Sequence, residues 1–310
     1  MTATQDFEGP AASWRIGAIT VHRVDELALT GMGPRVFADL PSDLVPLTPW
    51  LAPDHVDASG ELVGAVQTFA VEVAGRKVLV DTGIGNGKTL PNPRWSGLDT
   101  PFLDRLAAIG FPPESVDLVV NTHLHADHIG WNTRLDNGRW VPTFRNARYL
   151  TTRVEYEYWY SADLPPERRR MFTESVDPVR DSGLLDLVDV PPTGLEVVPG
   201  LTLLPAPGHT PGQVTVRLAG AGGAALITAD CMHHPVQLAR TEVCSVFDTD
   251  PAQAVRTRQA LLAEVAQTDT LLLGTHFAPP TGGRVRRDGD GYRLVSRRNP
   301  RGAEDLRIKP

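Results

Sequence analysis

The sequence predicts a single domain of the mixed α/β class, and three observations support this prediction. Short apolar runs typical of buried strands alternate with helical segments over the whole chain. No low-complexity linker and no internal repeat divides the sequence. The 310 residues are enough to bury one large core without disulfide bonds. We therefore expect one domain over residues 13–310, preceded by a small, polar and disordered segment at 1–12.

The first half of the chain is expected to contain strands, one long loop and one short helix. A strand-like stretch begins at Trp14. Five prolines in residues 30–57 exclude a long helix, so this segment is expected to be a loop that forms a lid or a site wall. Alternating residues from Val66 to Asp81 predict a β-hairpin that ends in the turn DTGIGNG. A short helix between Thr100 and Gly110 and a buried strand at Val116–Val120 follow.

The second half begins with an aromatic-rich insert at 131–178, in which Val154–Phe172 is expected to be helical. Asp250 and Pro251 begin a second helix that runs to about Gln267. Apolar runs predict further strands near Leu195–Leu204, Gln213–Leu218, Ala224–Thr228 and Thr270–Leu273.

Composition excludes several classes of protein. The formal net charge of −7 argues against a nucleic-acid partner, and the basic residues after Arg284 are interpreted as a solvated terminal strand and tail. No apolar run approaches the length of a membrane span, and the first ten residues lack the pattern of an export signal, so a cytoplasmic location is expected. The two cysteines, Cys231 and Cys244, are too few for a thiolate metal site. The oligomeric state stays open, with a homodimer as one alternative.

The segment NTHLHADHIG places His123, His125, Asp127 and His128 within six positions. His123 and His125 are two residues apart, so in an extended chain that leaves a strand they point the same way and can bind one ion. Asp127 and His128 follow as the chain turns, and can reach a second position about 3.5–4 Å from the first, the usual spacing of a two-metal site.

Three further side chains complete the pattern. His209 lies in the rigid turn PAPGHTPG, Asp230 follows the apolar run ALIT, and His276 follows the run TLLLG. The ends of strands are where α/β proteins tend to build their sites. A single histidine at such a place is more often a core or surface residue, but the combination of seven such side chains favours a metal site.

This pattern resembles the metallo-β-lactamase superfamily from about Gln67 to Ala278. The resemblance implies an αβ/βα sandwich with the metals at one edge of the two sheets. It also implies that Asp230 bridges two metals and that Asp81, in the turn DTGIGN, supports a ligand histidine. The remaining implied ligands are His123, His125 and His209 for the first metal, and Asp127, His128 and His276 for the second.

Within the superfamily, the segments DTGIGNGK, HLHADHIGW and GTHFAPP look most similar to the branch of N-acyl-homoserine lactonases and methyl parathion hydrolase-like enzymes. Asp230 and His128 are unlike the ligands of true β-lactamases, which disfavours antibiotic hydrolysis. The resemblance therefore implies a quorum-quenching type of hydrolase that acts on a small molecule.

Imidazole and carboxylate ligands suit two zinc ions, and manganese, iron or cobalt are also accepted by such ligands. The expected reaction is attack of a metal-bound hydroxide on the carbonyl of a lactone or a related ester, with Asp127 and Asp230 as catalytic residues. Two alternatives remain open. The same ligands can cleave a phosphotriester, and relatives in the superfamily use them for non-haem iron redox chemistry.

Aromatic side chains and one further histidine are candidates for the substrate wall. An aromatic stripe at helical spacing is more often core than wall, so both interpretations stay open. The candidates are Phe37, Trp50, Trp131, Tyr156, Trp159 and His233.

Overall fold

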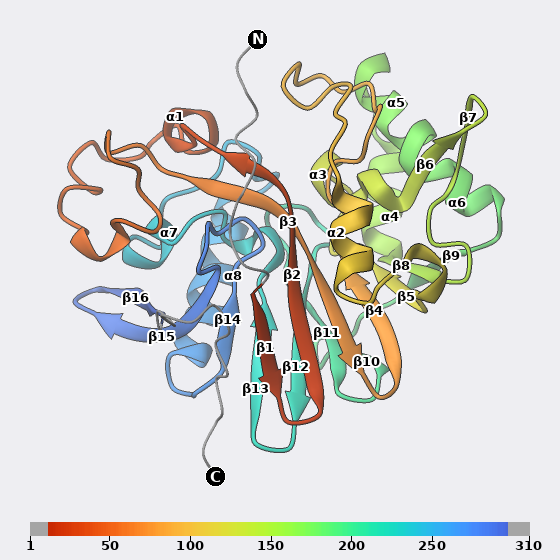
Figure 1. Ribbon diagram of the computed structural model, residues 1–310. Helices are drawn as coiled ribbons and strands as arrows, with labels where there is room; N and C mark the ends of the chain where they lie inside the picture. Colours follow the sequence, from red (N-terminus) through yellow and green to blue (C-terminus); the bar gives the residue numbers. More distant parts are fainter. Residues whose placement is uncertain (1–11, 297–310) are drawn as a thin grey trace.

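Two large β-sheets face each other in the computed structural model, which describes residues 12–296 (Figure 1). The first sheet is built mainly from the N-terminal half of the chain. Its seven strands, in spatial order, are β1 (Ser13–Ile16), β2 (Ile19–Leu29), β3 (Gly64–Val73), β4 (Arg76–Val80), β5 (Leu118–Val120), β8 (Arg148–Thr152) and β9 (Leu185–Val188).

The second sheet follows in the C-terminal half and keeps the order of the sequence. Its seven strands are β10 (Leu195–Val198), β11 (Leu201–Pro205), β12 (Val214–Gly220), β13 (Gly223–Ile227), β14 (Leu271–Leu273), β15 (Gly282–Asp288) and β16 (Gly291–Val295). A separate hairpin consists of β6 (Thr133–Asp136) and β7 (Arg139–Pro142).

The main hydrophobic core lies between the two sheets. Val71 and Val80 from the first sheet and Val216 and Ile227 from the second are at most 1% exposed and belong to one cluster. These side chains come from strands whose apolar residues alternate, so that one face of each strand is directed to the facing sheet.

Helices cover the outer faces of both sheets. Phe102 and Leu106 of α2 (Phe102–Ala108) pack on Leu79 and Val119 of the first sheet, and Leu262 of α8 (Pro251–Val265) packs with Leu226 and Leu272 of the second. The layers are therefore helix, sheet, sheet and helix, and the expected αβ/βα sandwich is confirmed (Figure 1). The remaining helices are α1 (Gly33–Val36), α3 (Ala126–Ile129), α4 (Arg153–Ser161), α5 (Pro166–Ser175), α6 (Asp177–Asp181) and α7 (Val236–Ala239), with 3-10 turns at Pro49–Leu51, Pro113–Ser115, Gly130–Asn132 and Ala229–Cys231.

Several elements match the sequence and one does not. The hairpin at β3 and β4 is confirmed, and α8 begins after Asp250, whose side chain accepts a hydrogen bond from the backbone N–H of Gln253. The single helix expected over Val154–Phe172 is wrong, because the structure has two helices, α4 and α5. The chain is extended at Ala162 and again at Pro165. Pro165 precedes Pro166, and a residue that precedes a proline disfavours the helical conformation.

The Pro-rich loop contains only α1 and one 3-10 turn, so the absence of a long helix from 30–57 is confirmed. The expected disorder at 1–12 falls, except for Ala12, outside the described residues, as does the basic tail beyond Ser296. In the part of the chain that the structure describes, no helix is both long and apolar enough to cross a membrane.

Sheet topology brings four strand ends to one edge. Strands β4 and β5 run parallel to each other in the first sheet, and β13 and β14 run parallel in the second. The carboxyl ends of parallel neighbours lie side by side, so the segments that follow these four strands meet at the same edge of the sandwich.

Candidate metal centre

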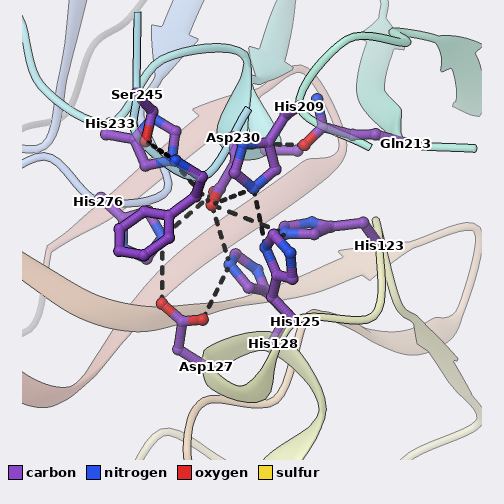
Figure 2. A network of polar contacts seen from close by, with 12 residues as sticks. His123, His125, Asp127, His128, His209, Gln213, Asp230, His233, Ser245 and His276 are labelled. Carbon is purple, nitrogen blue, oxygen red and sulfur yellow. Dashed lines mark hydrogen bonds and ion pairs between the residues drawn. The ribbon is translucent and has the colours of Figure 1, made fainter. Parts of the chain in front are cut away.

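Seven imidazole and carboxylate side chains meet at this edge, although they come from five loops or turns. The segment after β5 carries His123 and His125, and the first turn of α3 carries Asp127 and His128. The connection between β11 and β12 carries His209. The 3-10 turn after β13 carries Asp230, and the loop after β14 carries His276 (Figure 2).

A first ligand group consists of His123, His125, His209 and Asp230, whose ligand atoms lie within 4.8 Å of one another. His125 Nδ1 is 2.9 Å from His209 Nε2 and 3.1 Å from His123 Nε2. A second ligand group consists of Asp127, His128 and His276. The Asp127 carboxylate is 3.7 Å from His128 Nε2 and 3.6 Å from His276 Nε2.

Asp230 lies between the two groups. Its Oδ2 is 3.4 Å from His209 Nε2 in the first group and 3.3 Å from His128 Nε2 in the second. Its Oδ1 is 3.2 Å from His276 Nε2 (Figure 2). One carboxylate therefore faces ligand atoms of both groups.

Hydrogen bonds on the outer side of the rings fix which nitrogen faces the centre. His128 Nδ1 is 2.9 Å from an Asp81 oxygen, His209 Nδ1 is 2.9 Å from an Asp248 oxygen, and His276 Nδ1 is 2.9 Å from the Ala65 carbonyl. Because these partners accept hydrogen bonds, each Nδ1 carries the proton and each Nε2 of a neutral ring presents a lone pair to the centre.

With these rings neutral, the centre gathers acceptors rather than donors, which is the arrangement that a cation requires. Within the described residues, the buried atoms His128 Nε2 and Asp230 Oδ1 have no hydrogen-bond partner. Buried polar atoms are normally paired, since leaving one unpaired costs about 1–3 kcal/mol. Lone pairs of imidazole and carboxylate converging at this spacing fit divalent metal ions.

The charges of the ligands influence one another strongly. Burial would raise the pKa of Asp230, but the imidazoles of His276, His128, His233 and His123 hold it well below its ordinary value. Burial would lower the pKa of His128, but the carboxylates of Asp230, Asp81 and Asp127 raise it well above its ordinary value.

Asp81 is placed to orient His128 at the centre. Besides its contact with His128, it accepts hydrogen bonds from the backbone N–H of Thr122 at 2.7 Å and from the Thr122 hydroxyl at 2.8 Å. Its φ of 59° is left-handed, which is uncommon for a residue other than glycine. The turn after β4 therefore holds this carboxylate in one direction.

A family model described as the metallo-beta-lactamase superfamily matches residues 62–276. The chain belongs to this superfamily. The family resemblance seen in the sequence is thereby confirmed.

Curated relatives of this metallo-β-lactamase superfamily chain are named N-acyl homoserine lactonase. The one from Bacillus sp is 26% identical over 208 residues, which is 62% of this chain and 74% of the relative. Further lactonases match over shorter parts, and the matched part spans between 29% and 64% of their length.

Two solved structures share the fold over nearly the whole chain. The hydrolase AbOPH of the beta lactamase superfamily superimposes with a TM-score of 0.77 at 23% identity, and 95% of this chain and 99% of that chain are covered. AidC, described as a dizinc quorum-quenching lactonase, gives a TM-score of 0.76 at 18% identity with the same coverage. The named relatives are hydrolases, in agreement with the class of enzyme expected from the sequence.

The candidates for the substrate wall are placed differently from one another. His233 lies in the centre itself, with Nε2 at 3.3 Å from Asp230 Oδ2, and the Phe37 ring contacts its imidazole edge-on (ring centroids 6.3 Å apart). Trp159 contacts the His125 ring, with centroids 5.4 Å apart. His233 and Trp159 therefore contact side chains of the ligand groups, and Phe37 contacts His233.

The other three candidates pack elsewhere. Trp131 is 4% exposed and stacks on Phe102 in the core outside the first sheet. Tyr156 stacks on Tyr160. Trp50 is half-buried and packs against two hydrophobic clusters. Their contacts correspond to the core interpretation of the aromatic stripe, so none of the three is proposed to contact the substrate.

Sequence reasoning did not find three acidic residues that support the centre. Asp248 accepts a hydrogen bond from His209, Glu155 is a buried carboxylate bonded to a ligand loop, and Glu26 is a buried carboxylate bonded to the turn that carries Asp81. The pattern Thr152-x-x-Glu155 at the start of α4 is one signal, because a Glu at this position normally caps its own helix. Asp248 and Glu26 carry no comparable local signal.

Proposed function

We propose that this chain is a dinuclear metal hydrolase that opens the ring of an N-acyl homoserine lactone or a closely related lactone. The observation that carries the proposal is the position of Asp230, whose Oδ2 faces ligand atoms of both groups and whose Oδ1 faces the second group. A carboxylate placed in this way is suited to bridge two ions.

Each ligand group would hold one ion, with Asp230 shared between them. When bound, a pair of divalent cations lowers the pKa of a coordinated water to about 7 and polarises the carbonyl that is attacked. Zinc is favoured by the set of imidazole and carboxylate ligands. The description of AidC as a dizinc lactonase supports this choice.

One carboxylate of the centre is exposed enough to reach the substrate. The Asp127 carboxylate is 13% exposed, whereas the side chains of His128, Asp230 and His276 are at most 4% exposed. Asp127 can therefore hold a proton for the departing ring oxygen. His233 lies beside Asp230, with its Nε2 at 3.3 Å from Asp230 Oδ2 and both of its ring nitrogens buried.

The names of the curated relatives, N-acyl homoserine lactonases, support the lactone as the substrate. The chemistry of the centre alone would also serve an aryl ester or an aryl phosphotriester. A panel of N-hexanoyl homoserine lactone, an aryl ester and an aryl phosphotriester separates these substrates by kcat/KM.

The test combines metal content with this panel. We expect the purified chain to contain two metal ions, to prefer the lactone, and to lose activity when a chelator removes the ions. Asp230→Asn is expected to lower the metal content and to reduce kcat/KM by about 10³-fold or more, since loss of one electrostatic group at a reacting centre costs about that factor.

The matched control is Asp186→Asn, which changes an exposed carboxylate that is paired with Arg148 on the first sheet. This variant should retain two ions and full activity. One ion per chain, or an Asp230→Asn variant with two ions and normal turnover, contradicts the proposal. Iron with visible absorbance and no hydrolysis would instead favour the redox alternative.

A further inference from the structure

Two buried glutamates outside the ligand set have the same unusual environment. Glu155 is 0% exposed and Glu26 is 4% exposed. Each accepts hydrogen bonds from two backbone N–H groups and from one tryptophan indole. A buried carboxylate with such a specific set of donors fixes the position of every group that donates to it.

Glu155 connects two loops that carry the first ligand group. Its Oε1 accepts from the backbone N–H of Leu124, between His123 and His125, at 3.0 Å. Its Oε2 accepts from the backbone N–H of Gly212, three residues after His209, at 3.1 Å. All three imidazoles of the first group are thereby held by loops that share one carboxylate.

The start of α4 is shaped for this connection. Thr152 caps the helix by accepting from the backbone N–H of Glu155, and its hydroxyl donates to the Gly212 carbonyl at 2.7 Å. A Cβ at Gly212 would lie 2.2 Å from the Glu155 nitrogen, so only glycine allows this approach. The Trp159 indole donates to Glu155 Oε1 at 2.6 Å, while the Trp159 ring contacts His125.

Glu26 makes the equivalent connection on the side of the second ligand group. Its carboxylate accepts from the backbone N–H groups of Ile84 at 2.5 Å and Gly85 at 3.0 Å, and from the Trp131 indole at 2.7 Å. The register of β2 against β3 shifts between Asp25 and Leu27. Glu26 is therefore the extra residue of a β-bulge, a feature that often redirects a side chain.

The groups that Glu26 joins are the supports of His128. The turn after β4 carries Asp81, which contacts His128 Nδ1, and Thr82, whose N–H donates to the His128 carbonyl at 2.7 Å. The Gly130 N–H donates to the Gly83 carbonyl, also at 2.7 Å. Glu26 therefore fastens this turn to the helix that carries Asp127 and His128.

We infer that Glu155 and Glu26 are positioning residues that act separately, Glu155 on the first metal and Glu26 on the second. This inference rests on the proposed dinuclear function. Neither glutamate is a ligand, and each acts through the backbone of the loops that present the ligands. A partner that orients a ligand typically contributes about 10–100-fold to metal affinity.

The test measures metal affinity in two backgrounds that each lack one site. His276→Ala removes a ligand of the second group and leaves one ion at the first. His209→Ala removes a ligand of the first group and leaves one ion at the second. Competition with a chromophoric chelator gives the dissociation constant of the remaining zinc ion, and cobalt(II) absorption bands report its coordination.

We expect Glu155→Gln to lower the affinity for the remaining ion at least tenfold in the His276→Ala background. The affinity should be unchanged in the His209→Ala background. Glu26→Gln should show the reverse. Equal effects of both variants in both backgrounds, or no effect, overturn the inference. The core variant Ile16→Val, whose side chain lies between the sheets, controls for a general loss of stability.

Milder variants remain available if a glutamine variant does not fold. Trp159→Phe removes the indole donor to Glu155, and Trp131→Phe removes the indole donor to Glu26. The same selectivity is expected, with a smaller change in metal affinity. A parent chain that binds one ion overturns the proposed function together with this inference. A parent that binds two ions and hydrolyses the lactone, with variants that lack selectivity, overturns this inference alone.

Discussion

Substitution of Asp248 by Asn is expected to weaken both the fold and the first metal site. The side chain of Asp248 is 0% exposed, its Oδ1 accepts from His209 at 2.9 Å, and its Oδ2 accepts from the backbone N–H of Ser245 at 2.9 Å. The Oδ2 also lies 3.9 Å from Nη2 of Arg258, whose side chain is likewise 0% exposed. Asp248 is therefore the carboxylate that balances a buried guanidinium.

The magnitude follows from this geometry. At 3.9 Å and an effective dielectric constant of about 20, the attraction is about 4 kcal/mol. Relief of the burial cost of Asp248 offsets part of this loss, whereas an amide facing the Ser245 N–H adds an unpaired donor. We expect Asp248→Asn to lower the free energy of unfolding by about 2–4 kcal/mol. Metal affinity at the first site should fall about 10–100-fold.

Urea unfolding of the metal-free protein measures the first effect, and chelator competition measures the second. Asp269→Asn is the matched control, because Asp269 pairs with Arg284 and Arg286 on the surface, where its side chain is 71% exposed. The control should behave as the parent in both assays. An Asp248→Asn variant that is as stable as the control and binds metal normally would refute the reasoning.

Further predictions concern acidity and packing. Burial lowers the pKa of His55 to about 4, so the unfolded chain takes up a proton below pH 6.5 that the fold does not. Stability is therefore lost as the pH falls, and this residue accounts for about 2 kcal/mol of the loss at pH 5. In urea titrations of the metal-free protein, His55→Leu should reduce the acid destabilisation by about 2 kcal/mol. A Cβ at Gly130 would lie 1.7 Å from the Ile84 carbonyl oxygen, so Gly130→Ala should abolish soluble expression. Gly110→Ala, with no atom within 4 Å of its Cβ and a φ of 87°, should cost only about 1–2 kcal/mol in thermal unfolding and remain soluble.

Much of the fold and of the candidate centre could be predicted because its signals are local. His123, His125, Asp127 and His128 stand within six positions, and Asp230 follows a strand whose apolar run is legible in the sequence. The resemblance to the superfamily then connects these segments into one site. Pro165 and Pro166 mark the break between α4 and α5 in the sequence, and the expectation of one helix over Val154–Phe172 did not take them into account.

The supporting residues could not be predicted because their partners are distant in the chain. Glu155 is 31 residues from Leu124, Asp248 is 39 residues from His209, and Glu26 is 105 residues from Trp131. Spacing in one sequence does not show which of the many acidic residues will be buried against such partners. For the same reason the aromatic stripe did not show which of its rings lie next to the imidazoles.

Each ligand group is divided between the two halves of the chain. His123, His125, Asp127 and His128 follow strands of the first sheet, whereas His209, Asp230 and His276 follow strands of the second. A polypeptide cut between β9 and β10 would therefore yield two fragments, neither of which carries a full set of ligands for either ion. Bound metal would connect the two fragments of such a split protein, so that their reassembly would depend on the supply of metal.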